Sequence, residues 1–103
     1  MQKLIDETEA KAYVFLKEFG FEEDEIVPIV AKGKRDLETT LKNLEQMLSR
    51  PEAYSHDQAD SILHALKGLL AQMGNKEKAE ETEALREHPD RQKMLAWLER
   101  SRL

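Results

Sequence analysis

Apolar residues recur along this chain at the three- and four-residue spacing of amphipathic helices, without the strict two-residue alternation of half-buried strands. The pattern predicts helices over residues 1–19, about 24–49, about 56–74, 76–87 and about 90–102. Polar segments containing Gly or Pro separate them. Five helices with short connections indicate a single domain over the whole chain, an all-α, antiparallel four-helix bundle with an additional short helix.

The first two predicted helices carry apolar faces that should form much of the core. The face of the first comprises Ile5, Ala12, Phe15, Leu16 and Phe19. A straight stripe spans six turns of the second and comprises Ile26, Val30, Gly33, Leu37, Leu41, Leu44 and Leu48. Gly33 within the stripe predicts a close helix crossing, with a break in the helix as the alternative. Pro28 is tolerated best in a first turn, so this helix should begin close to it.

The last two predicted helices differ in their apolar content. Residues 76–87 are rich in Ala, Glu and Lys and offer a poor apolar face, which predicts a short, partly frayed helix. Asp90 can cap the final helix. That helix should bury Met94, Trp97 and Leu98, with Leu95 partly covered.

The third predicted helix carries a histidine on the side opposite its apolar stripe. Ser55 is its expected N-cap, Gly74 its expected stop, and the stripe comprises Ala59, Ile62, Leu63, Leu66, Leu70 and Met73. At about 100° per residue, His64 points roughly 150° away from the middle of this stripe. Lys67 and Gly68 follow it at i+3 and i+4. A glycine inside a helix costs about 1 kcal/mol relative to alanine, so we infer that Gly68 gives another protein access to the ring.

Composition excludes several classes of function. The net charge of the 103 residues is −5, which argues against general binding of nucleic acid. The absence of cysteine excludes disulfides and thiolate chemistry and suits a reducing, cytoplasmic setting. The chain shows neither the apolar run of a signal peptide nor a segment that could span a membrane. It also lacks a glycine-rich phosphate loop and a nucleophile elbow, so no nucleotide site is expected.

A metal site is the first alternative for the histidine-bearing helix. Asp57, Asp60 and His64 fall within about 60° of one another and could hold a divalent ion weakly. We disfavour this alternative because the sequence supplies no fourth ligand and Lys67 would repel a cation. His56 and His88 fit ordinary polar positions at helix ends.

The remaining chemistry for an exposed imidazole is nucleophilic. A neutral ring has a lone pair that can attack phosphorus, and a phosphoryl group on the ring would bring about two negative charges. Lys67 could offset that charge, and Gly68 would leave room for the donor or acceptor carboxylate. Because the chain has no nucleotide or magnesium site of its own, it would depend on a partner's active site.

The segment His64-Ala65-Leu66-Lys67-Gly68, with Gly74 six residues later, resembles the phosphorylation motif of histidine-containing phosphotransfer domains. That motif is His-x-Leu-Lys-Gly followed by a later glycine, on an exposed face of a small helical bundle. The chain departs from it at Leu63 and at Leu69-Leu70, where small residues are usual.

The resemblance implies a role for each matching residue. His64 would be the phospho-acceptor, Lys67 the residue that stabilises phosphoryl charge, and Gly68 the residue that gives clearance for docking. Gly74 would be structural, and Gln72 would be a polar neighbour of the acceptor.

The resemblance also implies a phosphocarrier rather than a self-sufficient catalyst. Phosphoryl groups would pass between His64 and an aspartate of a response-regulator receiver domain, or come from a hybrid sensor histidine kinase. A chemotaxis-type phosphorylation domain fed by a histidine kinase is a variant of the same function. The chain itself needs no cofactor, because the partner receiver domain would hold Mg²⁺. A monomer is expected, without nucleic-acid or membrane partners. The alternative is a helical interaction domain that presents an apolar groove to a partner helix and transfers no phosphate.

Overall fold

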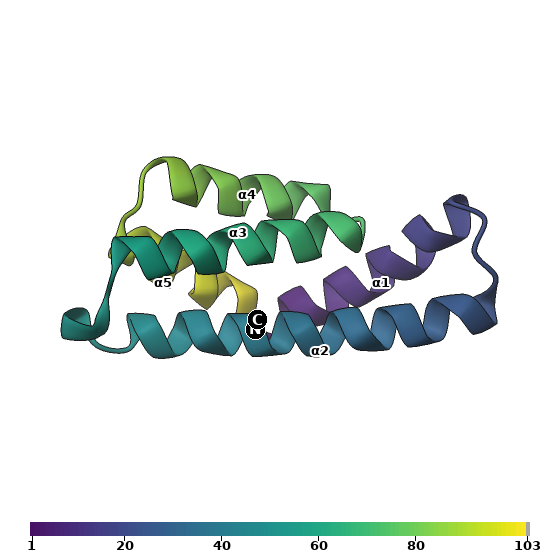
Figure 1. The fold of residues 1–103 in the computed structure, drawn as a ribbon, viewed down its shortest axis with the longest axis horizontal. Coiled ribbons are helices and arrows are strands. Elements are labelled where there is room, and N and C mark those ends of the chain that lie inside the picture. Colours follow the sequence, from purple (N-terminus) through teal and green to yellow (C-terminus); the bar gives the residue numbers. More distant parts are fainter. Residues whose placement is uncertain (103) are drawn as a thin grey trace.

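Residues 1–102, which the computed structural model describes, form five α-helices and one 3₁₀ turn, with no strand among them (Figure 1). The elements are α1 (Gln2–Glu18), α2 (Glu23–Leu48), η1 (Pro51–Ala53), α3 (His56–Gln72), α4 (Lys76–Glu87) and α5 (Arg91–Arg102). The predicted all-α class is confirmed, and every predicted helix is present within a few residues of its expected ends. None of the helices in this described part is long and apolar enough to cross a membrane.

The long helix α2 runs the length of the molecule, which measures 46 × 22 × 21 Å (Figure 1). Helix α1 packs against α2 toward one end, and α3 packs against α2 and forms a hairpin with α4. Helix α5 contacts both α1 and α2. Trp97 of α5 also donates a hydrogen bond from Nε1 to Glu81 Oε1 of α4, at 3.0 Å. Helix α3 is thus held between α2 on one side and α4 on the other.

The predicted apolar stripes of α2 and α3 meet in the core. Leu37, Leu41 and Leu44 of α2 are fully buried, as are Leu66 and Leu70 of α3. Burying each large aliphatic side chain stabilises the fold by about 1.5–3 kcal/mol. Because this stripe fixes the rotation of α3 about its axis, the opposite side of the helix faces outward.

Two glycines serve packing and chain reversal as predicted. A Cβ on Gly33 would lie 3.0 Å from Met73 Sδ, so α2 and the end of α3 cross closely there without a break in α2. Gly74 has φ +79°, and a Cβ on it would lie 2.5 Å from the Cβ of Phe15. The following amide, Asn75 N–H, donates to the Leu70 carbonyl at 2.8 Å and closes α3.

At the α1–α2 turn one expectation is confirmed and two are wrong. Helix α2 begins at Glu23, within one residue of the expected start, because Glu22 and Glu25 form a reciprocal capping box there. Pro28 therefore lies in the second turn of α2 rather than in the first. Pro28 is exposed, so the carbonyl that lacks its amide can bond water instead. Phe19, predicted to lie in the core, is 69% exposed because it follows the last residue of α1.

Helix α4 is a continuous 12-residue helix rather than a frayed one. Polar contacts replace the missing apolar face. The buried Asn75 side chain donates to Thr8 Oγ1 at 2.9 Å and accepts from the Lys78 amide at 3.4 Å, which caps the helix. Thr82 and Ala79 are buried on the inner side. The bond to Thr8 ties the start of α4 to α1, while the packing of α4 along α3 brings its charged residues to His64.

Candidate functional site

His64 is the ninth of the 17 residues of α3, and its side chain is exposed. Leu63 and Leu66, on either side of it in the sequence, are buried and fix the phase of the helix. The outward orientation predicted from the apolar stripe is therefore confirmed. Ser61 and Ala65 are exposed as well, so no bulky neighbour on α3 shields the ring.

Gly68 leaves open space one turn beyond His64. A Cβ built on this residue would meet no atom within 4 Å, in contrast to Gly33 and Gly74. The chain's own packing therefore gives no reason for a glycine here. Gly68 thus lowers the stability of α3 and leaves the surface beside His64 free of side-chain atoms.

The motif predicts that Lys67 reaches toward His64, but Lys67 pairs with a residue of α4 instead. Its Nζ lies 3.2 Å from Glu83 Oε2 on α4. The hydrogen bond from Lys67 lowers the pKa of the Glu83 carboxyl below its ordinary value, with a further contribution from Arg86. Lys67 is still half-exposed on the side of α3 next to the ring, from which its flexible side chain can turn to an added phosphoryl group.

The cation that contacts the ring is Arg86 of α4. Its Nη1 lies 3.1 Å from Nδ1 of His64 and 3.1 Å from Glu83 Oε2, and its Nε lies 3.0 Å from Asp60 Oδ1. The hydrogen bond between Arg86 and Asp60 lowers the pKa of the Asp60 carboxyl and raises that of the guanidinium. We call Asp60, His64, Lys67, Glu83 and Arg86 the charged cluster.

The sequence contains a signal for this cluster that helix-by-helix analysis misses. His64 and Arg86 each lie eleven residues from Asn75, and Lys67 and Glu83 each lie eight residues from it. In an antiparallel hairpin that turns at Asn75, residues equidistant from the turn lie opposite each other. A sequence search for pairs centred on the turn would therefore have found Arg86 and Glu83.

The remaining polar candidates lie apart from the ring. Gln72 is exposed two turns along α3, a rise of about 12 Å, so it is not the neighbour of His64 that the motif predicts. Within residues 1–102 no group of three or more His, Cys, Asp or Glu side chains is placed to hold a metal ion. Asp60 pairs with Arg86 instead. His56 is at the start of α3 and contacts the Tyr54 hydroxyl, and His88 caps α4.

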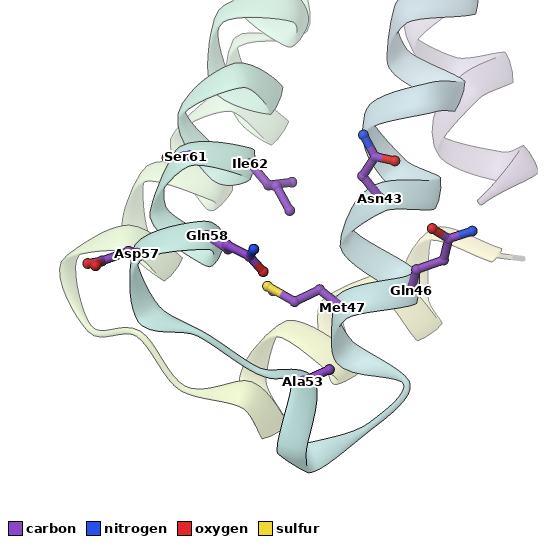
Figure 2. Close-up of a pocket in the computed structure, with 8 residues that line it drawn as sticks. All are labelled: Asn43, Gln46, Met47, Ala53, Asp57, Gln58, Ser61 and Ile62. Atoms are coloured by element: carbon purple, nitrogen blue, oxygen red, sulfur yellow. The ribbon is translucent and has the colours of Figure 1, made fainter.

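A groove of about 630 Å³ lies on the other side of α3, between α3 and α2 and next to η1 (Figure 2). Figure 2 shows Gln58 and Ile62 of α3 and Met47 of α2 pointing into the space between the helices. The lining comprises Asn43, Gln46, Met47, Ala53, Asp57, Gln58, Ser61 and Ile62. His64 is not part of it. The groove is apolar at its floor and mostly uncharged at its rim.

Comparison of the chain with protein-family models, with curated proteins and with solved structures finds no match. An exposed imidazole, open space at Gly68 and two cations one turn or one helix away suit a group that is both bulky and negatively charged. A phosphoryl group fits this description.

Proposed function

We propose that this protein is a histidine phosphotransfer protein that carries a phosphoryl group on His64. The observation that carries the proposal is the outward ring at the centre of α3 beside the open space at Gly68. The resemblance of residues 64–68 and Gly74 to the motif of histidine-containing phosphotransfer domains supports the same function. The donor and acceptor would be aspartates of response-regulator receiver domains, with a hybrid sensor histidine kinase as the upstream source.

The chemistry divides between the two proteins. A ring nitrogen of His64 attacks the phosphorus of an aspartyl phosphate on the receiver domain, and the P–O bond electrons return to the aspartate oxygen. The receiver supplies Mg²⁺ and its acidic pocket, while Lys67 and Arg86 offset the charge of the phosphohistidine. Gly68 lets the two backbones approach, since transfer depends mainly on positioning.

The test is transfer of radiolabel from receiver domains charged with labelled acetyl phosphate to the wild-type protein. His64→Gln should lose the label completely, and His88→Gln should keep it. His88 is the matched control because it is exposed and lies outside the charged cluster. Equal labelling of wild type and His64→Gln would disprove the assignment of the acceptor.

The second candidate is a helical interaction domain, and the groove between α2 and α3 favours it. Its apolar floor and amide-rich rim suit the apolar face of a partner helix. The two candidates differ in the residues on which they depend. Partner binding through the groove should fall with Ile62→Lys and stay unchanged with His64→Gln, which isothermal titration against a captured partner would measure.

A further inference from the structure

The contact between Arg86 and His64 defines which ring nitrogen carries the proton. A guanidinium has five N–H donors and no acceptor. The 3.1 Å contact between Arg86 Nη1 and His64 Nδ1 therefore makes Nδ1 the acceptor. The ring that accepts this bond is neutral and carries its proton on Nε2.

In this state neither nitrogen can attack phosphorus. The lone pair of Nδ1 is engaged by Arg86, while Nε2 is bonded to a proton and its remaining electron pair belongs to the aromatic ring. Nδ1 is turned toward α4, so Nε2 is the nitrogen open to a docking partner. The open nitrogen is thus the one that lacks a free lone pair.

The charged cluster is balanced without a phosphoryl group. Two carboxylates, Asp60 and Glu83, pair with two cations, Lys67 and Arg86. A phosphoryl group adds about two negative charges and disturbs that balance. Planar guanidinium binds phosphate oxygens in a bidentate manner, so Arg86 has a stronger ligand to move to.

We propose that Arg86 masks His64 in the resting protein and unmasks it when a phosphoryl group arrives. This proposal rests on the phosphotransfer function proposed above. Arg86 leaves Nδ1 for the phosphoryl oxygens of the receiver's aspartyl phosphate. Asp60, one turn before His64 on the same face, is then free to accept a hydrogen bond from Nδ1–H and to hold the ring in its reactive tautomer. Arg86 is a positioning residue in this scheme until it contacts the phosphoryl group.

Transfer to the unmasked ring moves two protons and one phosphoryl group. The Nε2 proton is released to water, and Nδ1 takes up a proton from water. The freed Nε2 lone pair forms the N–P bond while the bond between phosphorus and the aspartate oxygen breaks, with its electron pair remaining on that oxygen. The ring then carries Nδ1–H and the phosphoryl group on Nε2, with its positive charge facing Asp60.

The first test reads the tautomer directly by long-range ¹H–¹⁵N NMR of the phosphate-free protein. Wild-type His64 should show an unprotonated Nδ1 and a protonated Nε2. Arg86→Ala should raise the share of the Nδ1–H form, and Arg35→Ala on α2 is the matched loss of an exposed arginine. A wild-type ring with Nδ1–H, or a spectrum unchanged in Arg86→Ala, would overturn the proposal.

The second test measures reactivity with diethylpyrocarbonate, which acylates a free imidazole lone pair. Modification of His64 relative to His56, read by peptide mass spectrometry, should rise about threefold or more in Arg86→Ala, because a hydrogen bond is removed. Asp60→Asn removes the negative charge that holds Arg86 in place, so the modification of His64 should rise less than in Arg86→Ala. An unchanged ratio in both variants contradicts masking. Neither readout uses a phosphoryl donor, so a failure of masking is distinguishable from a failure of phosphotransfer at His64.

Discussion

The two sides of α3 differ in chemistry although they belong to one helix. On the α4 side, charged groups lie 3.0–3.2 Å from one another around His64. On the α2 side, amide and apolar side chains line the groove, and His64 is not among them (Figure 2). The groove and the charged cluster therefore lie on separate sides of α3. Phosphotransfer should depend on the first side and helix binding on the second, so variants on the two sides separate these functions.

The largest expected effect is the loss of phosphotransfer when a side chain fills the open face beside His64. Gly68→Gln should reduce phosphotransfer by about 100-fold or more, because its side chain fills the space that an incoming receiver domain needs. The same change should stabilise the fold by roughly 0.5–1 kcal/mol, because glutamine favours helix more than glycine does. Labelling kinetics and urea denaturation measure the two effects.

The matched control fills the groove instead. Asn43→Trp places bulk on the α2 side, and transfer should stay within about twofold of wild type if docking uses the open face. Strong inhibition by Asn43→Trp together with normal transfer in Gly68→Gln would reverse the assignment of the two sides.

Sequence analysis predicted the α3 side chains well because a strong apolar stripe sets the phase of that helix. Leu63, Leu66 and Leu70 are buried as expected, so the directions of His64 and Gly68 followed from geometry alone. The same reasoning failed at Phe19, because a periodic pattern does not show that α1 itself ends one residue earlier, at Glu18.

The sequence analysis does not predict the residues of α4 that face His64, because they make polar contacts with residues far from them in the sequence. Helix α4 has few apolar residues, so its phase could not be set from its own pattern. Arg86 is 22 residues from His64, and only the position of the turn at Asn75 relates the two. Lys67 was assigned to the ring from its i+3 spacing, whereas Glu83 on the facing helix holds it. Contacts within a helix follow from spacing, but contacts between helices need the register of the hairpin.

A smaller effect, on the free energy of unfolding, should follow from removing the polar contacts at the start of α4 without changing the groove. Asn75→Ala removes both the buried hydrogen bond to Thr8 and the cap of α4. The free energy of unfolding should fall by about 2 kcal/mol, since a buried partner is left unsatisfied and a cap is lost. Urea denaturation measures this loss, and Asn43→Ala, an exposed asparagine on α2, is the control. A loss below about 0.5 kcal/mol, the usual range for surface changes, would mean that α4 is held by other contacts.

The smallest expected effect is the change with pH in the stability that the charged cluster contributes to the fold. The pKa of Asp60 is lowered from 3.8 by the hydrogen bond from Arg86, and that of Glu83 is lowered from 4.5 mainly by Lys67. A carboxyl with a lowered pKa in the folded state stabilises the fold above its unfolded pKa, and this stabilisation is lost as the pH falls through the folded value. The double variant Asp60→Asn, Glu83→Gln should therefore be less stable than wild type at pH 7, by a small margin because these ion pairs are exposed. The margin should shrink below about pH 4.5 and vanish at lower pH.

Asn43→Trp removes no titratable group, so its difference from wild type in stability should not change with pH. Thermal melting across this pH range compares the three proteins, and a margin that persists in acid would show that the cluster stabilises α4 by packing rather than by charge.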